Sequence, residues 1–347
     1  MKSCLCWWTT FLKTLNGRLA YKRINTYESL KMAGLCNIDE AIHLLQSGQV
    51  VGLPTETVYG LGANALDTMA VAKVYEAKNR PSFDPLIVHV ADLDGVRNIA
   101  ELIPDAESLL LAFSPGPITV VLNKKPNVPD LVTSGHPTVA VRIPAHPMML
   151  QVLKQSGLYI AAPSANPFGF TSPTTAQHVL AQLGERIGGV LDGGPCKVGL
   201  ESTIVDFTGE SPKVLRLGGM DVDQLELVLG KLPVQTSSST PQAPGMLSTH
   251  YNPGSKIVLH DSSDKALNAA EASNDTAVLL FGPVDDARYE HQYTLSAAKS
   301  YREAAQNLFA VLRELGSKYP EIHVVRLPEE GLGRAINDRL VRAAATR

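Results

Sequence analysis

The sequence predicts an α/β fold, in which a mixed twisted sheet with flanking helices is followed by a small second α/β domain. From about residue 37 onward, short apolar runs alternate with stretches whose apolar residues recur at helical spacing. This alternation is typical of a sheet that is covered by helices. A stretch rich in Ser, Thr, Pro and Gly, residues 235–245, interrupts the pattern and predicts a linker between two domains.

Composition limits the class of protein. The 347 residues are 44% hydrophobic and 19% charged, which is enough to bury a sizeable core in one large or two medium domains. The formal net charge of −3 disfavours a protein that coats nucleic acid, and it still allows a local cationic cleft. The four cysteines lack zinc-ligand spacing, so we expect free thiols in a reducing compartment, the cytoplasm.

Residues 1–34 differ in character from the rest of the chain. Residues 1–31 carry six Lys or Arg and one acid, Glu28. Their apolar piece, residues 5–15, is interrupted and shorter than the roughly 20 apolar residues that span a bilayer, so we expect no membrane contact. The composition fits an organellar transit peptide or a basic, poorly ordered extension, and we expect the extension.

We expect the first domain to span residues 35–231. Its elements follow from apolar periodicity and from turn residues such as Gly48, which ends the first helix, and Pro115, which lies in a forced turn. The expected helices are 37–47, 68–78, 103–113, 147–156 and 175–183, and the expected strands are 50–53, 86–90, 118–122, 138–143, 159–162, 202–207 and 214–217.

The segment after the first strand indicates a ligand site. Pro54 has no N–H to donate to a sheet, so the strand should stop there and leave residues 55–57, Thr-Glu-Thr, at a mouth where their side chains can meet a ligand. Gly60 and Gly62 are expected in a small-residue loop that lets the backbone approach that ligand.

The linker is expected at residues 232–254 and the second domain at residues 255–347. In the second domain the apolar runs 256–259, 276–281 and 322–326 predict three strands, and residues 300–315 and 340–345 predict helices. The domain has no Gly-rich nucleotide fingerprint.

Three cations are candidates for ligand binding. Lys78 and Arg80 lie at a helix end, where they can converge on phosphate or carboxylate oxygens, although two solvated charges are the commoner arrangement there. Arg142 lies inside an apolar strand, so it must snorkel, pair with an acid or face a cavity. We favour the cavity, and a buried ion pair is the alternative.

Polar residues at strand ends are further candidates. His89 closes an apolar strand, where a histidine is more often structural than catalytic. Ser164 and Asn166 follow a strand end and present a hydroxyl and an amide on one side, or else form an Asx turn. Ser202 and Thr203 fit a helix cap or a pair of ligand hydroxyls equally well.

Several familiar motifs are missing from the sequence. There is no phosphate-binding Gly-x-x-x-x-Gly-Lys-Ser/Thr run, and residues 60–62, Gly-Leu-Gly, lack the third glycine of a dinucleotide fingerprint. There is no Gly-x-Ser-x-Gly elbow either. A bound nucleotide would therefore be held by side-chain cations, and covalent catalysis is not indicated.

These motifs together resemble the Sua5/YrdC/YwlC family, the threonylcarbamoyl-AMP synthases, in its longer two-domain form. The resemblance runs from about residue 37 to the C-terminus and includes the Lys-x-Arg motif at Lys78 and Arg80 and the Ser-x-Asn motif at Ser164 and Asn166. It implies a YrdC-like catalytic domain and a small Rossmann-like C-terminal domain. Residues 243–253 resemble the family's interdomain linker, which folds back over the cavity and offers Tyr251 to the nucleotide.

The resemblance implies a set of site residues and no protein-held metal. Lys78 and Arg80 would be catalytic. The L-threonine end would be lined by Thr57, His89, Arg142, Ser164 and Ser202, and the ATP end by Arg80, Asp84, Thr138, Asn166, Thr174, Arg216 and Tyr251. Asp84 departs from the Asn that is usual in relatives, and its charge should weaken phosphate binding unless Mg²⁺ or Arg80 compensates.

The implied reaction joins L-threonine, bicarbonate or CO₂, and ATP with Mg²⁺ into threonylcarbamoyl-AMP and pyrophosphate. The product would supply partner proteins that form N6-threonylcarbamoyladenosine on tRNA, and the protein could also contact RNA.

Two other functions are alternatives to this interpretation. A double-stranded RNA-binding factor in translation or ribosome maturation would bind without turnover. A carbamoyl-transfer module of hydrogenase maturation would need an acylphosphatase-like region and zinc fingers, and the sequence has neither.

Overall fold

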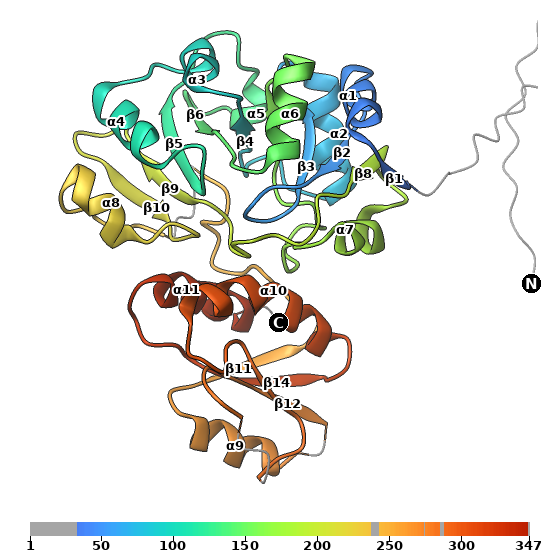
Figure 1. The fold of residues 1–347 in the computed structure, drawn as a ribbon, viewed down its shortest axis with the longest axis vertical. Helices are drawn as coiled ribbons and strands as arrows, with labels where there is room; N and C mark the ends of the chain where they lie inside the picture. The colour runs from blue at the N-terminus through green and yellow to red at the C-terminus, as the bar shows by residue number, and fades with distance from the viewer. Residues whose placement is uncertain (1–32, 237–242, 274, 285–287, 346–347) are drawn as a thin grey trace, which may run out of the picture. The chain divides into compact units, whose positions relative to one another are not determined.

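The computed structural model describes residues 33–236, 243–273, 275–284 and 288–345 (Figure 1). Nearly all of the expected N-terminal extension, residues 1–34, lies outside these ranges, as do residues 237–242 of the expected linker. Two separate sheets with flanking helices make up the described part, which confirms the α/β class. Within the described ranges, no helix combines the length and apolar character needed to cross a membrane.

The first sheet has ten strands in the order β1-β8-β2-β3-β7-β4-β6-β5-β9-β10. It is mixed, as predicted, because β4 and β6 run parallel whereas β5 and β6 run antiparallel. Its strands are β1 (Leu35–Cys36), β2 (Val51–Leu53), β3 (Gly60–Asn64), β4 (Ile87–His89), β5 (Ile118–Asn123), β6 (Thr138–Arg142), β7 (Ile160–Ala161), β8 (Gly189–Leu191), β9 (Thr203–Asp206) and β10 (Lys213–Arg216).

The helices of this part begin and end at recognisable caps. In α1 a capping box joins the Asn37 side chain to the Glu40 N–H and the Glu40 carboxylate to the Asn37 N–H. Helix α2 ends at Lys78 because Asn79 takes a left-handed φ of 51°. The helices are α1 (Ile38–Gln46), α2 (Thr68–Lys78), α3 (Leu93–Ile99), α4 (Pro104–Phe113), α5 (Asp130–Thr133), α6 (Pro147–Ser156), α7 (Ala176–Leu183) and α8 (Val222–Leu229).

The prediction of a loop at Gly60 and Gly62 is wrong. Both residues lie in β3, which pairs antiparallel with β2, so Gly62 is opposite Val51. A Cβ on Gly62 would lie 2.5 Å from Cδ1 of Leu53, closer than side chains pack. The glycine therefore serves the close packing of two neighbouring strands, which sequence alone cannot distinguish from a turn.

Strand register brings the polar strand ends together. His89 at the end of β4 is opposite Arg142 at the end of β6. Gly60 at the start of β3 forms an isolated bridge with Ser164, just beyond β7. Arg216 ends β10 opposite Ile204, after a bulge in the strand. The strands thus deliver an imidazole, two guanidinium groups and a hydroxyl to neighbouring positions.

The second sheet has four parallel strands in the order β11-β14-β12-β13. Helix α9 packs on one face and helices α10 and α11 pack on the other. The sequence missed β13, which has three polar or aromatic residues, and placed the start of α11 eight residues too late. The elements are β11 (Lys256–His260), β12 (Thr276–Leu280), β13 (Gln292–Thr294), β14 (Glu321–Val325), α9 (Ser263–Glu271), α10 (Tyr301–Gly316) and α11 (Leu332–Ala344).

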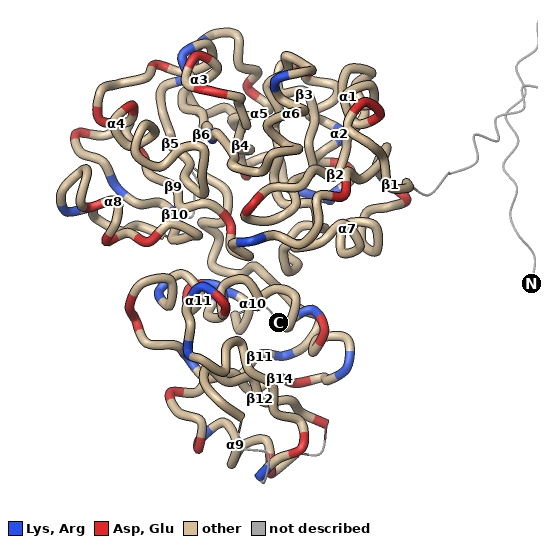
Figure 2. Tube along the Cα trace, viewed as in Figure 1, with Lys and Arg blue, Asp and Glu red and all other residues tan. Residues whose placement is uncertain are grey.

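The apolar core beneath α10 and α11 extends beyond the second sheet. It includes Val58 from the segment between β2 and β3, Leu200 from the segment before β9, and Tyr251 from the linker. Acidic and basic residues are interspersed along the described trace (Figure 2), in keeping with the small net charge. Any strong positive potential must therefore be local.

Candidate active site

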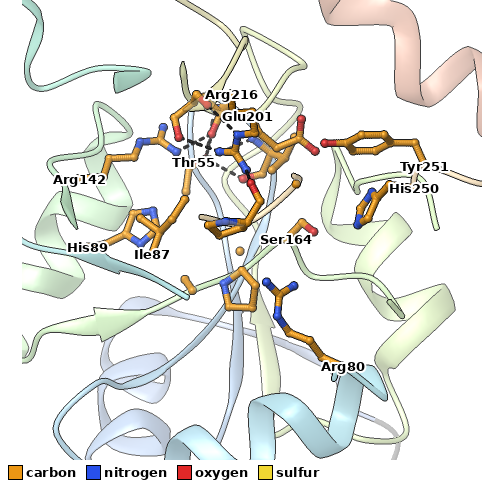
Figure 3. Close-up of a pocket in the computed structure, with 18 residues that line it drawn as sticks. Thr55, Arg80, Ile87, His89, Arg142, Ser164, Glu201, Arg216, His250 and Tyr251 are labelled. Atoms are coloured by element: carbon orange, nitrogen blue, oxygen red, sulfur yellow. Dashed lines mark hydrogen bonds between the residues drawn. The ribbon is translucent and has the colours of Figure 1, made fainter. Parts of the chain in front are cut away.

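A pocket lies where these strand ends, the linker and the segment before β9 meet (Figure 3). Eight of the predicted site residues line it: Thr57, Arg80, His89, Arg142, Ser164, Ser202, Arg216 and Tyr251. The rest of the lining consists of Thr55, Val58, Gly60, Ile87, Ala162, Pro163, Glu201, Pro244, Gly245 and His250. Figure 3 shows Arg142 and His89 on one side of the pocket, and Arg80, His250 and Tyr251 on the other.

Arg142 both faces the pocket and forms a buried ion pair, so the two arrangements that the sequence offered as alternatives occur at the same time. Its Nη2 donates to Glu56 Oε1 at 2.6 Å, and its Nη1 donates to Thr57 Oγ1 at 2.8 Å. The other carboxylate oxygen of Glu56 accepts from the Ala145 N–H at 3.0 Å. Both charged side chains are nearly excluded from solvent, at 4% and 10% exposure. The guanidinium plane is therefore fixed before any ligand arrives.

His89 is a neutral imidazole at the wall of the pocket. Burial, followed by the nearby Arg142 charge, lowers its pKa to about 3. Its Nδ1 has no hydrogen-bond partner among the described residues. A neutral ring with a free nitrogen can accept or donate one hydrogen bond to a ligand, depending on its tautomer.

Arg80 is paired with Asp84, the residue whose charge was expected to weaken phosphate binding. Its Nη2 lies 2.9 Å from Asp84 Oδ2, and the exposure of the two side chains is 4% and 2%. The same guanidinium donates to the backbone carbonyls of Asp84 and Pro85. Burial raises the pKa of Asp84 in spite of this cation. Arg80 thus offsets the extra carboxylate directly, and Asp84 itself lies outside the pocket lining.

Lys78 is placed behind the pocket instead of in its lining. Its ammonium donates to the backbone carbonyls of Ser164 and Asn166. Burial lowers its pKa well below the usual range. The Asn166 amide in turn donates to the carbonyls of Pro167 and Phe170 at 2.8 and 2.9 Å. Lys78 of the Lys-x-Arg motif thus holds the backbone of the Ser-x-Asn motif, and Ser164 faces the pocket.

Two further predicted residues lie outside the lining. Thr138 begins β6, opposite Asn123 in β5, and is half-buried. Thr174 is buried, with its hydroxyl 3.4 Å from His178 Nδ1. The structure therefore brings eight of the predicted residues into the pocket and leaves five outside its lining: Lys78, Asp84, Thr138, Asn166 and Thr174.

Arg216 and Ser202 connect the sheet to the linker. Arg216 Nη2 donates to Ser202 Oγ at 3.0 Å, and its Nη1 donates to the Pro244 carbonyl at 3.2 Å. The Ser202 hydroxyl is also 2.7 Å from the Thr119 hydroxyl. Burial lowers the pKa of Arg216 to about 10, so it stays charged at neutral pH. The hydroxyl alternative for Ser202, as a ligand-facing group, fits this placement better than a helix cap.

Sequence reasoning placed Thr55 at the mouth of a ligand site, where the structure has it in the lining, but it missed other lining residues, among them Glu201 and His250. Glu201 directly precedes Ser202, and His250 precedes Tyr251, so each is adjacent to a predicted residue. Burial lowers the pKa of His250 to about 3, which makes it a second neutral imidazole at the pocket. Only the tertiary arrangement shows that both side chains turn inward.

The electrostatics of the pocket suit an anionic ligand. Arg80, Arg142 and Arg216 face it, whereas the nearby carboxylates Glu56 and Glu201 are each bound to an arginine. Among the described residues, no cluster of three or more His, Cys, Asp or Glu side chains is arranged to hold a metal ion. Such a pocket binds carboxylate or phosphate groups through fixed guanidinium donors.

The fold and the pocket thus define a two-part α/β protein with an arginine-rich ligand site between the first sheet and a linker. Residues 43–218 match the Sua5/YciO/YrdC family model, described as "Telomere recombination", and residues 220–345 match "Threonylcarbamoyl-AMP synthase, C-terminal domain". The chain belongs to the Sua5/YrdC family, in the form that carries this C-terminal domain.

Several relatives resemble the chain over most of its length. Threonylcarbamoyl-AMP synthase of Bacillus subtilis is 39% identical over 323 residues, which is 89% of this chain and 93% of that protein. The protein of the same name from Pyrococcus abyssi is 38% identical over 318 residues, 88% of this chain and 94% of that protein. The crystal structure of P. abyssi Sua5 complexed with L-threonine has a TM-score of 0.83 and 37% identity, and covers 91% of this chain and 98% of that chain.

Proposed function

We propose that this protein is an L-threonylcarbamoyladenylate synthase, a nucleotidyltransferase that uses L-threonine, bicarbonate or CO₂, and ATP. The observation that carries the proposal is the pocket lined by Arg80, Arg142 and Arg216 in a chain that matches synthases of this name over 93% and 94% of their length. The L-threonine in the related P. abyssi structure supports the amino-acid substrate.

The reaction asks the protein for positioning and charge neutralisation. The threonine amine adds to CO₂ and loses a proton, and an oxygen of the resulting carbamate attacks the α-phosphorus of ATP. The bond from that phosphorus to the β-phosphate bridging oxygen breaks, and pyrophosphate leaves. No protein nucleophile is needed, which agrees with a pocket built from guanidinium and hydroxyl groups.

We assign the two sides of the pocket to the two substrates. On one side, Arg142 pairs with the threonine carboxylate, and Thr57, His89, Ser164 and Ser202 complete this end. On the other side, Arg80, Arg216 and Tyr251 meet ATP. Lys78, Asp84, Thr138, Asn166 and Thr174 lie outside the lining, and Lys78 acts from behind it, because it holds the backbone that presents Ser164.

Mg²⁺ enters this proposal as part of the substrate. The carboxylates at the pocket are occupied, since Glu56 is bound to Arg142 and Glu201 to Arg339. The ion would therefore be held mainly by phosphate oxygens of ATP and by water.

The product would go to separate proteins that modify tRNA. The free thiols of Cys36 and Cys196 suit a reducing compartment, for which we propose the cytoplasm.

Threonine-dependent pyrophosphate release tests the proposal. Purified protein with ATP, Mg²⁺ and bicarbonate should release pyrophosphate only when L-threonine is added, and Arg80→Ala should reduce the rate strongly. Arg97→Ala removes an exposed arginine remote from the pocket lining and should leave it unchanged. Release with another amino acid alone would overturn the substrate assignment. Absence of turnover together with salt-sensitive RNA binding would favour the RNA-binding alternative.

A further inference from the structure

Arg339 of α11 is a fully buried arginine that reaches the segment before β9. Its side chain has 0% exposure, and it lies outside the pocket lining. Its Nε and Nη2 both donate to Glu201 Oε2, at 3.2 and 3.1 Å, and its Nη1 donates to Asp338 Oδ2 at 3.0 Å. A buried guanidinium with two carboxylate partners is held in one orientation.

Glu201, the first residue that Arg339 holds, lines the pocket. Its second oxygen, Oε1, accepts from the Ser172 hydroxyl at 2.6 Å, so both carboxylate oxygens have partners. Its backbone carbonyl accepts from the Gly219 N–H at 2.8 Å. The following residue, Ser202, is also in the lining. Fixing the Glu201 carboxylate therefore fixes the segment that presents Ser202.

Tyr251, the second residue that Arg339 holds, comes from the linker. The Arg339 guanidinium carbon lies 5.4 Å from the centre of the Tyr251 ring, within the range of a cation–π contact. Tyr251 is also supported by Phe309 of α10, whose ring stacks on the Tyr251 ring at 5.4 Å between centres and 24° between planes. Tyr251 has a φ of 67°, which a non-glycine residue keeps only when its surroundings impose it.

We propose that Arg339 is a positioning residue of the active site: it acts from α11 through Glu201 and Tyr251, without touching a substrate. In this way the C-terminal region orients a pocket whose lining belongs to the earlier part of the chain and the linker. The inference rests on the proposed function for its activity assay. The competing role is purely structural, in which Arg339 only holds α11 to the first part of the chain.

The positioning role predicts the activity of three variants. Arg339→Met should lower kcat/KM for ATP and L-threonine by about 10²-fold, the size expected when a pocket group is displaced by about 1 Å. Arg339→Lys keeps the charge and loses the planar fork, so it should recover only part of the activity. Because Arg339 acts through Glu201, Arg339→Met combined with Glu201→Gln should be no worse than Arg339→Met alone.

A matched control lies on the same helix. Arg334, five residues earlier on α11, pairs with Asp221 and Asp223 at 2.8 Å and lies outside this pocket. Arg334→Met should keep kcat/KM within twofold of the wild type. A purely structural role for Arg339 predicts that any loss follows the unfolded fraction, so thermal unfolding of each variant is recorded at the assay temperature.

Binding of ATP, measured by calorimetry without turnover, separates this inference from the proposed function. If the wild type makes no threonylcarbamoyl-AMP, the proposed function fails, and weaker ATP binding by folded Arg339→Lys still supports the positioning role. If Arg339→Met does not fold, Arg339→Lys carries the test. Folded Arg339→Lys with wild-type kcat/KM and wild-type ATP affinity would overturn the inference.

Discussion

The ion pair between Arg142 and Glu56 gives the most quantitative prediction for the site. Arg142→Met removes the cation and leaves the Glu56 carboxylate, on a side chain that is 10% exposed, with only the Ala145 N–H as a partner in the described structure. Breaking a buried pair by removing one member typically costs about 3–5 kcal/mol, because an uncompensated charge stays behind. We expect the free energy of unfolding to fall by about this amount.

Urea titration at pH 7, followed by circular dichroism, measures that loss. The double variant Glu56→Gln with Arg142→Met should recover about half of it or more, because the remaining neutral amide no longer needs a counter-ion. Arg97→Met, which removes the two ion pairs of an exposed arginine, should stay close to the wild type. A loss below about 1 kcal/mol for Arg142→Met, the size found for solvent-exposed pairs, would refute the burial argument.

Three further predictions concern the nucleotide side and the linker. Asp84→Asn releases Arg80 from its carboxylate partner and should lower the KM for ATP severalfold in steady-state kinetics; an unchanged or higher value would contradict this. Gly245→Ala should lower kcat/KM about tenfold with little change in melting temperature. Gly245 has a φ of 85°, a backbone conformation that costs other residues about 1–2 kcal/mol of strain, and a Cβ there would lie 3.0 Å from Arg216 Cδ. Burial alone would raise the pKa of Glu201, but its arginine neighbours lower it to about 2, from 4.5. Its ionised form therefore stabilises the fold fully above about pH 4.5, and this contribution is lost as the pH falls towards 2. Urea titrations between these pH values should show a smaller fall in the free energy of unfolding for Glu201→Gln than for the wild type.

The first sheet was largely predictable because its signals are local. Asn37 and the apolar spacing that follows it fixed α1 to within a residue, and Pro54 correctly marked the end of β2. The loop predicted at Gly60 and Gly62 was wrong, because the sequence does not distinguish a glycine that allows a turn from one that allows close contact between strands. The start of α11 was missed because Asn337 and Arg339 read as polar surface, although both are buried.

The pocket was predictable where a motif identified the residue, and not where a contact decides its role. Arg142 stood out as a cation in an apolar strand, yet its partner Glu56 is 86 residues away in the chain. Lys78 belongs to a strong motif, and only the structure shows its ammonium on two backbone carbonyls. Glu201 and Arg339 are 138 residues apart, a separation that no local pattern reveals.

The fate of labelled bicarbonate tests the central claim most directly. The protein is incubated with ATP, Mg²⁺, L-threonine and ¹³C-bicarbonate, and the adenylate product is analysed by mass spectrometry. The account predicts threonylcarbamoyl-AMP that carries one ¹³C atom, in the carbonyl between the threonine nitrogen and the phosphate oxygen, together with one pyrophosphate per product. Unlabelled threonyl-AMP, in which the amino-acid carboxylate itself has attacked ATP, would contradict the account.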